Sequence, residues 1–152
     1  MRILLDTNVL LRLDDVAHAQ HADALAATEH LHADGHTCVL VPQVLYEFWV
    51  VATRPLEVNG LGLDVARVDQ ILDEWMRFFP VLLDERGVFR LWRNLVRSYA
   101  VLGKLAHDAR LVAAMQRHGV THLLTFNQPD FARFSAIEVL TPADVLTGRL
   151  PA

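Results

Sequence analysis

The sequence has little cysteine, no long apolar run and no excess of positive charge. Its 152 residues include a single cysteine, Cys38, which excludes an internal disulfide bond and fits a reducing compartment. No apolar stretch approaches the roughly 18 residues that a membrane span needs. Asp6 also interrupts the apolar N-terminus where a signal peptide would continue. We therefore expect a cytoplasmic protein without membrane segments, in which Cys38 is a small buried hydrophobe rather than a nucleophile.

The charge balance argues against a broad surface that grips phosphates. The formal net charge is −4, whereas proteins that bind nucleic acids are usually basic. Apolar residues make up 53% of the chain and charged residues 21%, which indicates a globular domain rather than a disordered one. The mean hydropathy of +0.24 is high for a soluble monomer, so a buried partner surface is expected.

Short apolar segments alternate with longer amphipathic ones along the chain. We predict strands at residues 2–5, 37–41, 121–125 and 137–140, with a further short strand at 81–83. We predict helices from about residue 8, over 18–33, 42–53, 64–78, 86–102 and 107–118, and from Pro142. Strands separated by helices are typical of a mostly parallel sheet covered on both faces, and such sheets bind ligands at the carboxyl ends of their strands.

Four acidic residues lie where that edge of the sheet would gather them. Asp6 follows the first strand, and Glu47 is the only charge in an apolar helix. Asp108 begins a helix, and Asp130 closes a turn after the strand that ends at Thr125. Carboxylates that converge on one point are the ligands that Mg²⁺ and Mn²⁺ prefer. The sequence therefore predicts a divalent cation site at this edge.

Asp6 and Glu47 also have simpler explanations. Asp6 stands where a helix cap is common, although Thr7 or Asn8 could cap that helix instead and leave Asp6 free. An unpaired buried carboxylate costs several kcal/mol, so Glu47 must be paired, exposed at an edge or bound to a metal. An ion pair between Glu47 and Arg54 is the simplest alternative.

Asp108 and Asp130 are weaker candidates when each is taken alone. Asp108 shares an apolar helix face with Leu111, Val112 and Met115, which would place it at the inner rim of that face. A carboxylate near a helix start is also stabilised by the helix dipole. Asp130 follows Asn127-Gln128-Pro129, where turn chemistry explains an aspartate equally well.

The ordered set of these segments resembles PIN domains, and the VapC-type toxins among them in particular. The segments that carry the resemblance are Leu5-Asp6-Thr7-Asn8-Val9-Leu10, residues 44–55 around Glu47, Ala106-His107-Asp108-Ala109-Arg110-Leu111, and Leu123-Leu124-Thr125-Phe126-Asn127 with Asp130-Phe131. They occur in order and span essentially the whole chain. The resemblance implies a single PIN-like nuclease domain over residues 1–152, of the α/β class, with four to five mostly parallel strands flanked by helices.

The resemblance also implies an activity, a cofactor and partners. It implies an endoribonuclease that depends on Mg²⁺ or Mn²⁺ and acts as the toxin of a toxin–antitoxin pair, with a cognate antitoxin and a homodimer. The catalytic and metal-binding residues carried over are Asp6, Glu47, Asp108 and Asp130, and the orienting residues are Thr7, Asn8, Thr125 and Asn127. Many relatives carry an aspartate where this chain has Asn127, so either Asp130 takes the place of that fourth acid or the site holds one cation firmly and a second only with RNA.

Arginines supply the second functional pattern. Arg86, Arg90, Arg93 and Arg97 recur at helical spacing, and no acid occurs between Arg86 and Tyr99 to neutralise them. We name these four the arginine stripe; its alternative explanation is an ordinary solvated helix face. Four arginines on one face could follow an RNA backbone, and Arg110 is a further candidate.

Two other functions compete with the nuclease. A non-catalytic PIN-like module that binds RNA or protein is supported by Asn127. A phosphatase or a receiver domain also places an aspartate at a strand end. The phosphatase, however, would need an acid at position 8, where this chain has Asn8. The receiver domain would need an aspartate where Val41-Pro42 stands.

Overall fold

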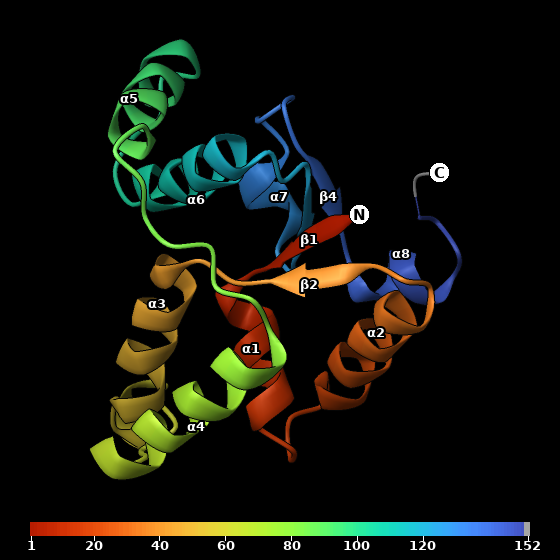
Figure 1. Ribbon diagram of the computed structural model, residues 1–152. Coiled ribbons are helices and arrows are strands. Elements are labelled where there is room, and N and C mark those ends of the chain that lie inside the picture. Colours follow the sequence, from red (N-terminus) through yellow and green to blue (C-terminus); the bar gives the residue numbers. More distant parts are fainter. Residues whose placement is uncertain (151–152) are drawn as a thin grey trace.

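The sheet lies at the centre of the protein, which is described here from a computed structural model over residues 1–150 (Figure 1). Its strands are β1 (Arg2–Leu5), β2 (Thr37–Val39), β3 (His122–Leu124) and β4 (Glu138–Leu140). Their order is β2-β1-β3-β4, and every neighbouring pair is parallel. This confirms the predicted α/β class with a parallel sheet. The last two residues of the predicted domain, 151 and 152, lie outside the described residues.

Helices cover the sheet on both faces. They are α1 (Thr7–Asp14), α2 (His21–Ala33), α3 (Pro42–Thr53), α4 (Val65–Phe78), α5 (Val88–Ser98), α6 (Leu105–His118), α7 (Gln128–Phe131) and α8 (Pro142–Leu146), with a 3₁₀ turn at Leu56–Val58. Figure 1 shows α5, α6 and α7 on one side of the sheet and α1, α2, α3, α4 and α8 on the other. In residues 1–150, no helix is both long and apolar enough to cross a membrane.

The strand predicted at 81–83 is reduced to a single bridge beside the β2 edge. Leu40 pairs with Val81, and the Leu40 N–H donates to the Pro80 carbonyl at 2.9 Å. The Leu82 N–H donates to the Leu40 carbonyl at 2.8 Å. The sheet therefore has four strands, and one further segment continues it only at this bridge.

Two predicted helices were too long, and one helix was missed. The helix predicted over 18–33 begins at His21. The helix predicted over 86–102 begins at Val88, so Arg86 lies outside it. It ends at Ser98 because Ala100 adopts a left-handed φ of 48°, and the Val101 N–H turns back to the Val96 carbonyl at 3.0 Å. The turn predicted around Asp130 is the short helix α7.

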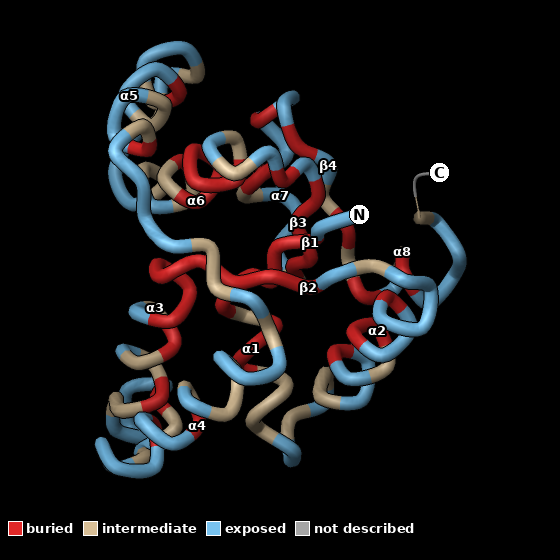
Figure 2. The backbone as a smooth tube through the Cα atoms, in the orientation of Figure 1, coloured by how far each residue is buried: buried red, intermediate tan, exposed pale blue. Residues whose placement is uncertain are grey.

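The core is continuous through the sheet, as the buried segments in Figure 2 show. Ile3, Leu4 and Leu5 of β1 are fully buried on both faces, which explains why this strand is an unbroken apolar run. Cys38 is buried too, and burial raises the pKa of its thiol to about 11. The prediction that Cys38 is a packed side chain rather than a nucleophile fits this environment.

Candidate active site

The candidate site lies at the edge of the sheet that is formed by the carboxyl ends of β1 and β3. From β1 the sheet extends to β2 on one side and to β3 on the other, so the carboxyl ends of β1 and β3 face a topological switch point. Asp6 follows β1 and Thr125 follows β3. The Asp6 N–H donates to the Leu124 carbonyl at 3.0 Å, which places the two segments side by side.

Asp6 is buried at this point, with 7% of its surface exposed. One carboxylate oxygen accepts the Thr7 N–H at 2.7 Å, and the other accepts Thr125 Oγ1 at 2.6 Å and Asn8 Nδ2 at 2.9 Å. Asp6 therefore occupies the cap position of α1 itself, which corrects the assignment of that role to Thr7 or Asn8. Burial raises its pKa to about 6 against these hydrogen bonds, and the Glu47 charge adds to the rise.

Asn8 and Thr125 join the start of α1 to the segment after β3. Asn8 Nδ2 also donates to Thr125 Oγ1 at 2.9 Å, and Asn8 Oδ1 accepts the Phe126 N–H at 3.1 Å. Thr125 Oγ1 accepts the Asn127 N–H at 3.0 Å. With its one hydroxyl proton given to Asp6, Thr125 has every hydrogen-bonding position engaged. These contacts hold the Asp6 carboxylate in one orientation.

Glu47 is held by polar neighbours rather than by a cation. Thr7 Oγ1 donates to one carboxylate oxygen at 2.7 Å, and Gln43 Nε2 donates to the other at 2.9 Å. The alternative ion pair with Arg54 is wrong, because Arg54 Nε is buried without a hydrogen-bond partner in the part of the chain described. Glu47 is therefore neutralised by no arginine or lysine within residues 1–150.

Gln43 is a site residue that the sequence analysis missed. Its amide nitrogen donates to the His107 carbonyl at 2.8 Å as well as to Glu47, and its oxygen accepts Arg110 Nη1 at 2.9 Å. Arg110 also pairs with Asp84 at 3.1 Å. Gln43 thus fixes α3 against the start of α6. Arg110, a predicted RNA-binding residue, directs its guanidinium into this network.

Asp108 lies in the first turn of α6, beside the other acids. Its pKa is raised to about 6, first by burial and then by the charges of Asp130, Asp6 and Glu47. The predicted inward face is confirmed, because Leu111, Val112 and Met115 are buried. The fold thus gathers all four predicted acids closely enough for their charges to raise the pKa of Asp108.

Asp130 reaches this group from α7. After burial, the charge of Asp130 is the largest cause of the raised pKa of Asp108, and it also raises the pKa of Asp6. Asn127 Nδ2 donates to the Asp130 carboxylate. Asn127, which stands where many relatives have an aspartate, therefore binds Asp130, the acid that would take the place of that aspartate.

The donor chemistry suits a hard divalent cation, although the carboxylates are turned to protein donors. In residues 1–150, no three His, Cys, Asp or Glu side chains are close enough to form a ready metal site. Asp6 and Glu47 instead accept hydrogen bonds from Thr125, Thr7 and Gln43. Carboxylates that repel one another in a partly buried site are stabilised by a cation. By the chemistry of their donor atoms, Asp6, Glu47, Asp108 and Asp130 therefore fit Mg²⁺ or Mn²⁺.

Replacing Gln43 by leucine is expected to lower the free energy of unfolding by about 3 kcal/mol. The change leaves the His107 carbonyl, Arg110 and Glu47 without their shared partner, and buried groups that lose a partner are costly. Urea unfolding measures the loss. Gln70→Leu is the matched control, because Gln70 donates to Glu74 with the same spacing but on an exposed face. Equal losses in the two variants would contradict a buried network.

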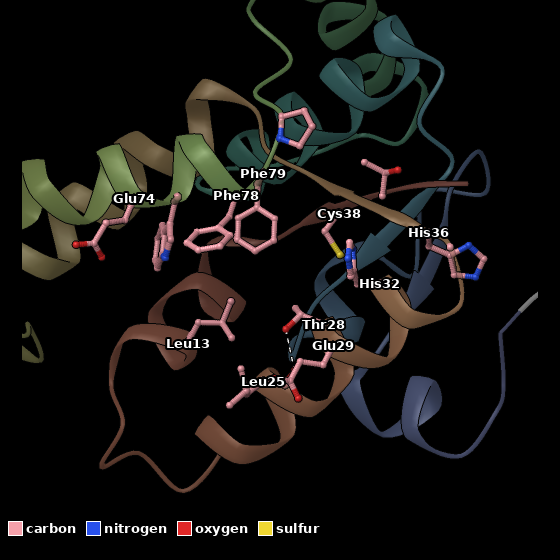
Figure 3. A pocket seen from close by; sticks show the side chains of 14 residues that line it. Leu13, Leu25, Thr28, Glu29, His32, His36, Cys38, Glu74, Phe78 and Phe79 are labelled. Carbon is pink, nitrogen blue, oxygen red and sulfur yellow. Dashed lines mark hydrogen bonds between the residues drawn. The ribbon is translucent and has the colours of Figure 1, made fainter.

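An apolar pocket opens elsewhere on the molecule (Figure 3). Its volume is about 830 Å³, and it is lined by residues of α1, α2, β2 and α4. Figure 3 shows Phe78 and Phe79 on one side and Leu13 and Leu25 opposite. None of the four acids lines this pocket, so it is a surface separate from the acidic site.

This chain is similar to known proteins in sequence pattern and in fold. Residues 3–137 match the family model of the PIN domain. Among curated proteins, none is significantly similar in sequence. The VapBC2 structure of Rickettsia felis, bound to a DNA fragment from its promoter, shares 16% identity over 93% of this chain and 98% of that one, with a TM-score of 0.66.

Two further solved structures share the fold. A toxin–antitoxin complex from Klebsiella pneumoniae is 21% identical over 92% of this chain and 97% of its own, with a TM-score of 0.62. VapC20 of Mycobacterium tuberculosis, described as a toxin that cleaves the sarcin–ricin loop, is 18% identical over 87% and 95%, with a TM-score of 0.62. Identities this low show a common fold. The family match spans most of the sequence and includes all four acids, and the chain belongs to the PIN domain family.

Proposed function

We propose that this protein is a metal-dependent endoribonuclease that acts as the cytoplasmic toxin of a toxin–antitoxin pair. The observation that carries the proposal is the gathering of Asp6, Glu47, Asp108 and Asp130 at one switch point. There Asp6 and Asp108 both have a pKa raised to about 6. Carboxylates forced together at such cost to their charged forms are typical of functional sites.

In this proposal Asp6 and Asp108 hold Mg²⁺ or Mn²⁺, with Asp130 as the supporting acid. The cation supplies an acidic water and stabilises the charge that develops on a phosphodiester. Thr125 and Asn8 keep the Asp6 carboxylate oriented through their hydrogen bonds. Glu47, fixed by Thr7 and Gln43, orients the attacking water or serves as a further ligand.

The neighbours' descriptions support the biological role. The structure from Klebsiella pneumoniae is described as a toxin–antitoxin complex, and VapC20 is described as a toxin that cleaves the sarcin–ricin loop. We infer that this chain likewise binds an antitoxin and forms a homodimer. The apolar pocket of Figure 3, with Phe78 80% exposed beside it, is the surface that would receive an antitoxin segment.

One observation favours a second candidate, a non-catalytic module that binds RNA or protein. Asn127 stands where many relatives have an acid, and its side chain holds Asp130 by a hydrogen bond. If Asp130 stays with Asn127, only three acids remain for a cation. The two candidates differ in whether RNA is cut.

Purified protein is expected to cleave a pool of cellular RNA in Mg²⁺ or Mn²⁺, and to lose cleavage in EDTA. Asp6→Asn should be inactive because it removes a charge from the proposed ligand set. Asp69→Asn is the matched control, since Asp69 lies on the exposed face of α4 and its replacement should leave cleavage unchanged. Cleavage that survives EDTA would reject the metal. A folded protein that binds RNA without cutting it would favour the non-catalytic module.

A further inference from the structure

The arginine stripe is exposed and unpaired, with Arg90, Arg93 and Arg97 on α5 and Arg86 in the turn just before it. Arg86, Arg90, Arg93 and Arg97 are all exposed, and in the described part of the chain no carboxylate forms a salt bridge with any of them. The opposite side of α5 packs on α6, where Val88 and Leu95 are buried. Figure 1 shows α5 outermost over α6, so the stripe faces away from the core. Like charges held together without acids favour an anionic ligand.

An exposed aromatic ring borders the stripe. Phe89 is 67% exposed, and helical spacing places it next to Arg93, one turn further along α5. Its ring centroid lies 5.8 Å from that of Trp92, with the planes tilted by 31°. Trp92 Nε1 in turn donates to the Ala106 carbonyl at 2.8 Å. One side of the Phe89 ring therefore packs against Trp92, and the rest of the ring is exposed to solvent.

The stripe and the ring are linked to the acidic site. The Trp92 hydrogen bond fixes α5 to Ala106, two residues before Asp108 at the start of α6. A polar hollow lined by Asn94, Arg97 and Ser98 lies beside the C-terminal end of the stripe. The C-terminal end of the stripe thus lies at the end of α5 from which the chain turns into α6, and the first turn of α6 carries Asp108.

We propose that the α5 face, defined as the arginine stripe together with Phe89, binds a single-stranded RNA segment and holds it next to the four acids. The arginines contact phosphates, and Phe89 stacks on an unpaired base. A duplex keeps its bases stacked on one another, so it would use the arginines but not the ring. This inference rests on the proposed function, because it names the surface of this chain that would hold the RNA beside the site.

Binding is tested in the Asp108→Asn full-length protein, which prevents cleavage. The probe is a fluorescent oligouridine of about 16 nucleotides, compared with an RNA duplex of similar length. Four phosphate contacts predict a slope of log affinity against log salt of about −3. The double variant Arg90→Gln/Arg97→Gln should roughly halve that slope and weaken binding by about tenfold or more at low salt.

Matched variants separate the α5 face from general charge and general apolarity. Arg67→Gln/Arg77→Gln removes the same charge from the exposed side of α4 and should leave affinity and slope nearly unchanged. Phe89→Leu should weaken oligouridine binding by about tenfold while leaving duplex binding unchanged. Leu83→Ala removes an apolar side chain of similar exposure, 69%, from a segment outside the α5 face and should have no effect on the oligouridine.

Specific results would overturn the inference. It fails if the α4 pair weakens binding as much as the α5 pair, because net charge alone would then explain the affinity. It fails if Phe89→Leu binds oligouridine like its parent, or if the stripe variants retain full RNA affinity, as expected were the face to receive an acidic protein instead. A wild-type protein that never cuts RNA, yet shows these binding losses, would reject the nuclease and support the α5 face.

Discussion

The Asp108→Asn variant is expected to lose RNA cleavage by at least about a hundredfold and yet to unfold at a higher temperature than the wild-type protein. The loss of activity follows from the removal of one proposed cation ligand. The gain in stability follows from the removal of a charge that burial and three neighbouring carboxylates disfavour. The two effects have opposite signs because the site gathers carboxylates for function at the expense of the metal-free fold.

Asp108 suits this test because, within residues 1–150, its carboxylate forms no hydrogen bond or salt bridge. The causes of its pKa shift include no hydrogen bond, so the amide of an asparagine displaces no donor. Asp6 differs, since each of its oxygens accepts a donor: Thr7 N–H on one side, Asn8 and Thr125 on the other. An asparagine amide at position 6 would face a donor in either orientation. We therefore expect Asp6→Asn to be less stable than Asp108→Asn, although both are inactive.

Thermal unfolding in EDTA and RNA cleavage in Mg²⁺, measured on the same preparations, check this prediction. Asp69→Asn again serves as the control, with unchanged cleavage and little change in stability. An Asp108→Asn protein that is inactive and also less stable than wild type would mean that Asp108 has a structural role. An active one would remove Asp108 from the proposed ligand set.

The sheet and the position of the acids could be predicted because local patterns determine them. Apolar runs such as Ile3-Leu4-Leu5 must be buried on both faces, and their alternation with helices leaves few topologies other than a parallel sheet. Asp6 and Thr125 directly follow such runs, so a parallel sheet brings them to one edge. Thr125 Oγ1 therefore donates to the Asp6 carboxylate at 2.6 Å although the two residues are far apart in the sequence.

Tertiary contacts explain what could not be predicted. Gln43 was a polar residue in an apolar helix, and only the approach of α6 supplies His107 and Arg110 as its partners. A glutamine four residues before Glu47 was the available signal. The early end of α5 depends on Ala100 adopting a left-handed conformation that alanine rarely takes, so neither propensity nor a nearby glycine indicated it.

Mg²⁺ is expected to raise the unfolding temperature only slightly at pH 5 and strongly above pH 7. In the metal-free protein Asp6 and Asp108 each have a pKa of about 6, so both are largely protonated at pH 5. A cation must then displace those protons before it binds. Above pH 7 both groups are ionised, and the cation relieves their repulsion at no such cost. The thermal shift with Mg²⁺ should therefore increase steeply through pH 6.

The stability of the metal-free protein should decrease as the pH rises, whereas the thermal shift with Mg²⁺ increases. The pKa of each acid is higher in the folded protein than its ordinary value of 3.8, so between pH 4 and 6 the folded state binds more protons than the unfolded state. The contribution of these groups to stability is therefore lost as the pH rises through that window. For Asp6 the shift from 3.8 to about 6 corresponds to about 3 kcal/mol.

Thermal unfolding of wild type and Asp108→Asn in EDTA, followed from pH 4 to pH 8, isolates this effect. The advantage of Asp108→Asn should be absent near pH 4, where wild-type Asp108 is neutral, and should reach its full size above pH 6. Asp144 provides a control of opposite sign, because hydrogen bonds from Thr141 lower its pKa and its replacement should be costly above pH 4. A gap between wild type and Asp108→Asn that did not change with pH would show that their difference lies in packing, and the acids would then be too far apart to share a cation.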